Sequence, residues 1–377
     1  MIHALVLIAL LVFSFPQAKT FIPVEGANLK TRIDAAIVAG KANAVNGRFW
    51  VAYQFEVRPG VAVDFEIVDG SGDVYISMDG TSMMMDPRHE TRELGLFLLY
   101  DTQRESFIRA DIYNLRRTHE YSNYPVYWAG RISNEESLNY LKSIIDSPAP
   151  EMNRLDERAV FAIALHDDAR VDALLTELIR RPVAEPTRSR AIHWLGYTPE
   201  TQAKNTMFAE IVRNTQESSD ARQAAISALA MSRSPAALPV LENLFETMPA
   251  RELKRRALQG IARNDNTDAA ATYLIRVAEN EKDMELRKSA VANLGPIAGQ
   301  KSLGALTGTL DGDADIELQK QAVVAIGRRP KDEAIPILIR TARNHPKMPV
   351  RKVAIQVLGQ TGDERAVAFF RELLSKD

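Results

Sequence analysis

Apolar positions recur at helical spacing through most of the chain, but alternate with polar ones near its beginning. Leu286, Ala290, Val291 and Leu294 lie at i, i+4, i+5 and i+8, so they share one stripe of a helix. Between residues 49 and 67 the apolar side chains instead occupy alternate positions, as they do in half-buried strands. The pattern therefore predicts an α+β protein, with a small β-rich part followed by helices.

The helical stripe belongs to a pattern that occurs seven times. Aligned on one alanine, successive copies are 32, 34, 32, 33, 32 and 32 residues apart, a constancy that unrelated amphipathic helices would not keep. In each copy a helix ends, a short polar turn follows and a second amphipathic helix begins, which predicts an antiparallel pair of helices. The anchor alanines are Ala159, Ala191, Ala225, Ala257, Ala290, Ala322 and Ala354.

This repeat resembles the HEAT-repeat superfamily, particularly its short HEAT-like, phycobilisome-lyase-type variety, over residues 150–377. The resemblance implies a superhelical solenoid of about seven helix pairs, in which each repeat completes its core against the next. It also implies that the second helix of each pair lines a concave binding face. Those second helices include the stretches that begin at Ala169, Ala236 and Ala334. We expect the anchor alanines to be buried.

The beginning of the chain resembles an export signal. An apolar run from Ala4 to Phe15 turns polar at Gln17, and it is too short to span a bilayer as a helix. We expect residues 1–18 to be a signal peptide cleaved after Ala18, with an uncleaved anchor as the alternative. The chain has no cysteine, which excludes disulfides and thiolate chemistry. These features predict an exported protein, either periplasmic or secreted, that does not stay inserted in a membrane once the signal is removed.

The region between the signal and the repeats predicts a separate domain. Residues 19–134 should form a small, mainly antiparallel β domain that resembles no family we recognise, with two strands joined as a hairpin at Pro59 and Gly60. Residues 135–149 should form a linking helix that packs on the first repeat and caps it, because a terminal repeat has no neighbour on one side. The solenoid then occupies residues 150–377.

Charge argues against nucleic acid as a partner. Residues 1–150 hold 14 Lys and Arg against 18 Asp and Glu, and residues 151–377 hold 33 against 31, without the positive excess that phosphate backbones require. Most copies of the repeat nevertheless carry a basic residue three positions before the anchor alanine. Either these residues bind an acidic ligand, or they form an internal ladder of bonds to neighbouring carbonyl or carboxylate groups, and the near-zero regional charge favours the ladder. The seven positions are Asp156, Arg188, Arg222, Lys254, Arg287, Gln319 and Arg351.

The sequence contains no motif of a known catalytic or cofactor site, and it predicts no cofactor. Asp311, Asp313 and Asp315 are weak candidates for a calcium site, because Ile316 and Ala322 stand where a calcium loop needs Gly and Glu. A methionine cluster around Met84 is a still weaker candidate for copper.

Two classes of function remain open. The favoured interpretation is a non-enzymatic scaffold that binds a protein or peptide on the concave face of the solenoid. The alternative is an enzyme, such as a hydrolase, with its site in the β domain. A bilin-lyase activity, suggested only by the family resemblance, fits poorly with an exported protein.

Overall fold

The computed structural model describes residues 21–64, 66–68, 74–76, 84–85, 90–147, 155–312 and 315–375. The chain divides into two compact units, Met1–Val171 and Asp172–Asp377, which we call the sheet unit and the helical unit. This division falls after the predicted boundary at residue 149. Helix α3 (Leu155–Leu165), which carries the first anchor alanine, therefore belongs to the sheet unit.

The sheet unit is built around a mixed sheet of five strands. The longer pairings, β2 with β7 and β7 with β8, are antiparallel, whereas β9 pairs with β1 and β2 in parallel. In sheet order the strands are β1 (Ile22–Pro23), β9 (Val126–Arg131), β2 (Arg48–Gln54), β7 (Leu94–Asp101) and β8 (Ser106–Asn114). Two short pairs lie outside this sheet: β3 (Val61–Ala62) with β6 (Met84–Met85), and β4 (Glu66–Val68) with β5 (Val74–Ile76).

The predicted hairpin at Pro59 and Gly60 is wrong. Strand β2 pairs with β7 and β9, and the strand that follows Gly60, β3, pairs with β6. The physical reason is that β2 is apolar on both faces, since Phe49 and Trp50 are both fully buried. Such a strand is stable in the middle of a sheet, where neighbours and covering side chains exclude water from both faces.

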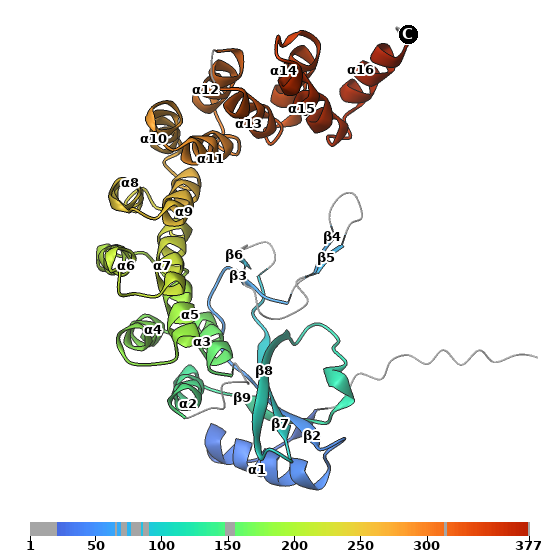
Figure 1. Ribbon diagram of the computed structural model, residues 1–377. Helices are drawn as coiled ribbons and strands as arrows, with labels where there is room; N and C mark the ends of the chain where they lie inside the picture. Colours follow the sequence, from blue (N-terminus) through green and yellow to red (C-terminus); the bar gives the residue numbers. More distant parts are fainter. Residues whose placement is uncertain are drawn as a thin grey trace, which may run out of the picture. The chain divides into compact units, whose positions relative to one another are not determined.

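Helices α1 (Leu29–Ala42) and α2 (Asn134–Asp146) pack in the sheet unit (Figure 1). Gly40 of α1 lies so close to Phe49 that a Cβ atom at this position would come within 2.3 Å of its ring. Ser133 caps the N-terminus of α2, and its side chain accepts a hydrogen bond from the Glu136 amide. Leu138 and Leu141 of α2 are buried, and the helix packs against α3, so the predicted contact between this helix and the first repeat helix is confirmed.

The helical unit consists of two layers of helices (Figure 1). In the inner layer each helix packs directly on the next member of the layer, and the outer helices pack against it from one side. Together with α3 these helices make fourteen between Leu155 and Leu374 in the described residues, as predicted. The inner layer comprises α5 (Glu185–Leu195), α7 (Ser219–Met231), α9 (Arg251–Ala262), α11 (Met284–Leu294), α13 (Ile316–Ile326) and α15 (Met348–Gly359). The outer layer comprises α4 (Arg170–Arg180), α6 (Gln202–Arg213), α8 (Leu238–Thr247), α10 (Thr267–Asn280), α12 (Gln300–Asp311), α14 (Lys331–Asn344) and α16 (Glu364–Leu374).

The anchor alanines belong to the inner layer and to α3, and all seven are buried, as predicted. Figure 1 shows the inner layer on the inside of the curve that the helical unit follows. The helices expected on the concave face, including α4, α8 and α14, are instead the outer layer. That expectation is wrong, because the outer helices from α6 to α14 pack mainly on the inner helix that follows each of them and not on the one before it.

The packing reveals the correct phase. Helix α10 packs extensively on α11, and α14 on α15, whereas α11 and α12 make much less contact. Each structural repeat therefore consists of an outer helix followed by an inner helix. The two kinds of turn are similarly short, with residues 281–283 between α10 and α11 and residues 295–299 between α11 and α12, so turn length does not mark where a repeat begins.

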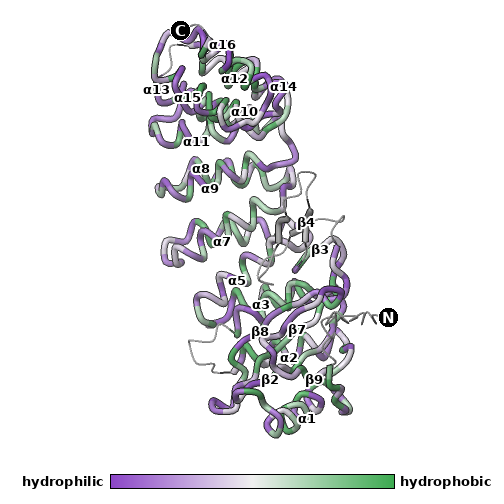
Figure 2. Tube along the Cα trace, turned by 90° about the vertical axis from the view of Figure 1, so that its right-hand side faces the viewer, coloured by the Kyte–Doolittle hydropathy of each residue, from purple (hydrophilic) through white to green (hydrophobic). Residues whose placement is uncertain are grey.

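Small residues set the distance between neighbouring inner helices. Gly196 follows α5 and lies against the backbone of Ala228 in α7, where a Cβ atom would come within 2.5 Å of the Ala228 Cα. Gly295, three repeats after Gly196, lies in the same way against Ala325 of the next inner helix, α13. Each of these glycines stands five positions after an anchor alanine and contacts the residue three positions after the next one. In Figure 2 the hydropathy alternates along these helices, as expected for helices with one buried side.

Candidate functional site

The exposed side of the inner layer, which we call the inner face, is the first candidate surface. It is the side of the inner helices that is turned away from the outer layer. The positions two before and two after the anchor alanine are exposed on it in two of the inner helices: Arg255 and Gln259 in α9, and Lys352 and Gln356 in α15. This periodicity brings one residue from each repeat into a row across neighbouring helices.

Three of the residues that stand three positions before an anchor alanine bond to backbone carbonyls within the helical unit. Arg188 donates from Nε to the carbonyl oxygen of Ile179 at 2.8 Å, and Arg287 donates to that of Ala278 at the same distance. Arg222 does the same with the Val212 carbonyl. Each bond joins an inner helix to the end of the outer helix before it, where helix carbonyls lack partners and favour positive charge.

The predicted internal ladder is therefore confirmed for these arginines. Gln319, which interrupts the run of basic residues, also takes part: its Nε2 donates to the Leu310 carbonyl at 3.0 Å. The position thus requires a hydrogen-bond donor rather than a charge. Lys254 departs from the rule, since its Nζ lies 4.9 Å from the centre of the Phe245 ring.

Other cations on the inner helices do reach the surface. We call Arg255, Lys288, Lys320 and Lys352 the basic row; they stand two positions before successive anchor alanines. Three of them form ion pairs with a glutamate one turn earlier: Arg255 with Glu252, Lys288 with Glu285 and Lys320 with Glu317, each at 2.9 Å. In α15 the glutamate position is occupied by Pro349. The basic row therefore loses its intrahelical counter-charge at that end.

The charge of the helical unit is sorted between its layers. Inner helices α9, α11, α13 and α15 carry nine Lys and Arg and three Glu. The outer helices α8, α10, α12, α14 and α16 carry seven Lys and Arg and nine Asp and Glu. The near-zero total of the region conceals this difference, and the inner layer has the positive excess.

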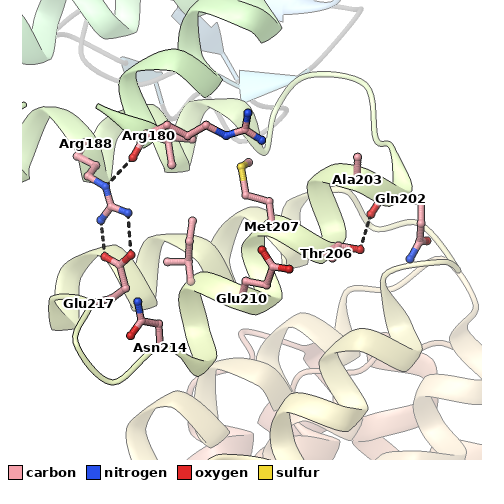
Figure 3. Close-up of a pocket in the computed structure, with 11 residues that line it drawn as sticks. Arg180, Arg188, Gln202, Ala203, Thr206, Met207, Glu210, Asn214 and Glu217 are labelled. Atoms are coloured by element: carbon pink, nitrogen blue, oxygen red, sulfur yellow. Dashed lines mark hydrogen bonds and ion pairs between the residues drawn. The ribbon is translucent and has the colours of Figure 1, made fainter. Parts of the chain in front are cut away.

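A cleft of about 870 Å³ opens among α4, α5 and α6 and the turn after α6. Ile179, Met207 and Ile211 form its apolar part. Figure 3 shows Arg188 and Glu217 facing each other on one side of the cleft, where Arg188 Nη2 lies 2.8 Å from Glu217 Oε1. Both side chains are more than four-fifths buried. The cleft thus combines apolar surface with an internally paired charge, which suits a side chain of a partner better than proton transfer.

The sheet unit holds a buried serine–histidine pair. Ser137 Oγ lies 2.8 Å from Nε2 of His166, whose Nδ1 lies 2.7 Å from the Ala162 carbonyl oxygen. The hydroxyl of Tyr53 completes the chain of bonds at 3.0 Å from Ser137 Oγ. Burial lowers the pKa of His166 to about 4. A serine and a histidine at this distance resemble a nucleophile and its base, but Ser137 is completely buried.

This network holds α2 and α3 against the strands. Phe55 stacks on the His166 ring at 4.2 Å between centroids. All the side-chain polar atoms of His166 and Ser137 have partners within the network, as buried polar groups require.

A second histidine, His193 in α5 of the helical unit, also has a lowered pKa. Burial, with a smaller contribution from Arg190, lowers it to about 4, and the ring packs edge to face on Trp194.

Two residues of the weak calcium candidate are bound to other groups of the chain. Asp311 accepts a hydrogen bond from Arg340 at 2.8 Å, and Asp315 caps α13 by accepting one from the Glu317 amide at 2.7 Å. Asp313 lies outside the described residues, as do the side chains of the methionine cluster around Met84. Within the described residues no three His, Asp or Glu side chains are grouped to hold a metal ion.

The fold of the helical unit is that of an α-solenoid, a class of repeat proteins with extended binding surfaces. Residues 171–262 and 305–377 match the family model of HEAT repeats, so these stretches are HEAT repeats and the predicted resemblance is confirmed there. The first match begins in α4 and ends in α9, in agreement with repeats that run from an outer to an inner helix. No curated protein matches the chain.

Several solved structures are similar to the chain. Human deoxyhypusine hydroxylase in complex with glycerol is 16% identical over 63% of this chain and 90% of its own, with a TM-score of 0.32. The complex of CpcE and CpcF of phycocyanin lyase from Nostoc sp. PCC7120 is 15% identical over 65% and 94%, with a TM-score of 0.33. The Cnd3–Cnd2 subcomplex of S. pombe condensin is 17% identical over 65% and 34%, with a TM-score of 0.38. These scores are too low to transfer any function.

Proposed function

We propose that the protein is a non-enzymatic scaffold that holds a protein or peptide partner on the inner face of its helical unit. The observation that carries this proposal is the basic row, which brings one cation from each of four successive inner helices to the inner face apart from the ladder. Stacked HEAT repeats supply the extended surface, because each repeat adds the same face in the same orientation. The ladder and the buried glycine contacts support rigidity, which lowers the entropic cost of binding.

Site-specific cross-linking tests this proposal. A photoreactive amino acid is placed at Gln356, exposed on inner helix α15, or at Glu279, exposed on outer helix α10. We expect the inner position to cross-link to one dominant protein from the native extract, and unlabelled full-length chain to compete for that product. Equal cross-linking from both positions, or none from Gln356, would contradict binding on the inner face.

Export is a separate part of the proposal. It is supported by the apolar run from Ala4 to Phe15 and by the lack of cysteine. Within the described residues, no helix is long and apolar enough to cross a membrane. Expression of the full chain followed by cell fractionation and N-terminal sequencing tests it. A mature chain that starts at Lys19 outside the cytoplasm is expected, and an uncut chain in the cytoplasm would contradict export.

A hydrolase is the second candidate, because the distance between Ser137 and His166 suits a nucleophile and its base. The complete burial of Ser137 argues for a structural role. If purified protein hydrolyses a small ester, the Ser137→Ala variant decides the matter. Full loss of activity in a variant with an unchanged melting temperature would support the hydrolase, and retained activity would exclude Ser137.

A further inference from the structure

The basic row follows the repeats in strict register. Arg255, Lys288, Lys320 and Lys352 are separated by 33, 32 and 32 residues, and they lie on the consecutive inner helices α9, α11, α13 and α15. Because these helices pack directly on one another, the row crosses four neighbouring helices. A ligand that follows the row meets one cation per repeat.

The spacing of the row suits an extended chain. Packed helices lie about 8–10 Å apart, and the inner helices are in such direct contact, as Gly295 and Ala325 show. A peptide in the extended polyproline II conformation advances about 3.1 Å per residue with three residues per turn, so one turn spans about 9 Å and every third side chain lies on the same face. A partner segment with an acidic residue at every third position would therefore place one carboxylate at each cation.

The existing ion pairs do not prevent this contact. Lys288 and Lys320 pair with glutamates that are 60% and 52% exposed, and pairs of this kind contribute at most about 1 kcal/mol. A lysine ammonium has three donors, so it can keep its glutamate and bind a second carboxylate. Nearby Glu317 and Asp315 also raise the pKa of Lys288, after the larger effect of its bond to Glu285. The lysine therefore stays charged.

The glutamates beside the basic row restrict where an acidic segment can bind on the inner face. Glu252, Glu285 and Glu317 form a parallel row one helical turn from the cations. An acidic segment displaced toward that row would bring like charges together, which is unfavourable. A polyanion with charge at every position, such as a nucleic acid, would meet both rows at once.

We propose that the inner face from α9 to α15 binds an extended acidic segment of a partner protein, whose carboxylates recur at every third residue. This inference rests on the proposed scaffold function and specifies its ligand. Charge complementarity with the basic row selects the segment, and the spacing between repeats sets its register.

Fluorescence anisotropy with synthetic peptides tests the inference. The probe is a labelled twelve-residue peptide with Asp at every third position and Ser or Ala elsewhere, and its isomer carries the four Asp in one block. We expect the spaced peptide to bind the full chain at least tenfold more tightly than the isomer, and to weaken as salt rises. Equal affinity for both peptides would overturn the register.

Two matched variants locate the site. The inner variant combines Arg255→Ala, Lys288→Ala, Lys320→Ala and Lys352→Ala. The outer variant removes four exposed cations from the outer layer: Arg276, Lys301, Arg340 and Arg371, each replaced by Ala. We expect the inner variant to lose at least tenfold in affinity and the outer variant to bind like the wild type, with both folded by circular dichroism. Equal losses would overturn the inference, and so would single-stranded DNA of equal charge binding as tightly as the spaced peptide.

These results can be separated from the fate of the scaffold itself. If the spaced peptide does not bind but the cross-linker at Gln356 still captures a competed partner, the acidic segment is wrong and the scaffold stands. If the cross-linker also fails, the inner face is not a binding surface, and both proposals fall.

Discussion

The two units of the protein build their cores from different side chains. The sheet unit buries large aromatic residues completely, among them Phe49, Trp50, Tyr53, Phe97 and Tyr127. The inner layer of the helical unit instead packs through alanine and glycine, with Gly196 against Ala228 and Gly295 against Ala325. Large side chains bring together strands that are distant in sequence, whereas small ones let identical neighbours approach closely. The aromatic core of the sheet unit is a single cluster, whereas the small-residue contacts between inner helices recur from repeat to repeat.

This difference predicts that the two units fail separately. Replacing Ala290 by Glu places a charge at a fully buried position of α11. We expect a loss of about 4 kcal/mol, because a buried charge without a partner is strongly destabilising. Calorimetry should show the transition of the helical unit move to lower temperature, while that of the sheet unit stays in place. The control is Ala368→Glu at an exposed position of α16, and an unchanged transition for Ala290→Glu would refute the predicted burial.

The repeat could be predicted from sequence because its period is local. Each copy repeats the same buried alanine and the same stripe within one helix, so alignment of the chain with itself is sufficient. The repeat period, however, does not show at which residue each repeat begins. Whether Gly295 ends a repeat or lies in its middle depends on which helices pack along each other, and both connecting turns are short. The period alone therefore does not show which layer of helices lines the concave face.

Strand pairing in the sheet unit could not be predicted for a related reason. Alternation of apolar residues identified β2, but its partners β7 and β9 come about 40 and 75 residues later, and long-range pairing leaves no local signal.

The candidate binding surface was also concealed in the sequence. The charge of the region sums to nearly zero, and the basic row becomes visible only when the helices are sorted into layers. The spacing of Lys288, Lys320 and Lys352 at the repeat period was the available signal.

The sheet unit should also respond to pH through His166. Burial lowers the pKa of this histidine from 6.5 to about 4, so between these values the unfolded chain binds a proton that the folded chain does not. The contribution is fully present above pH 6.5 and is lost as the pH falls toward 4. A shift of this size corresponds to about 3 kcal/mol.

Chemical unfolding of the sheet unit between pH 4 and 7 measures this effect. The experiment uses a His193→Gln background, because the pKa of His193 in the helical unit is lowered in the same way. Adding His166→Gln should flatten the pH dependence of the sheet unit. Asp168, whose pKa Arg170 lowers to about 2, titrates below this window. An equally steep dependence in the double variant would rule out His166 as its source.

The close approach of the inner helices can be tested at two equivalent glycines. A Cβ atom at Gly295 would lie 2.7 Å from the Ala325 carbonyl oxygen, but one at Gly359, in the same position of the last repeat, would meet nothing within 4 Å. We expect Gly295→Ala to destabilise the helical unit by about 2 kcal/mol through overpacking. Gly359→Ala should be neutral or stabilise it by up to about 1 kcal/mol, since alanine favours the helix. Equal effects at both sites would show that inner helices are not held by this contact.

The smallest expected effect separates the ladder from the binding surface. Arg287→Ala removes the bond from Nε to the Ala278 carbonyl and should cost about 1.5 kcal/mol, as for other hydrogen bonds from charged groups. Lys288→Ala, one residue away, loses only an exposed ion pair and should cost less than about 0.5 kcal/mol. Arg287→Gln should recover most of the loss, because Gln319 makes the equivalent bond to Leu310 without a charge. Binding of the spaced acidic peptide should follow the opposite order, with Lys288→Ala weakening it and both Arg287 variants leaving it unchanged once folded. If Arg287→Ala lowered the affinity without lowering the stability, the ladder would have to be assigned to the ligand, and the division between structural and binding cations would fail.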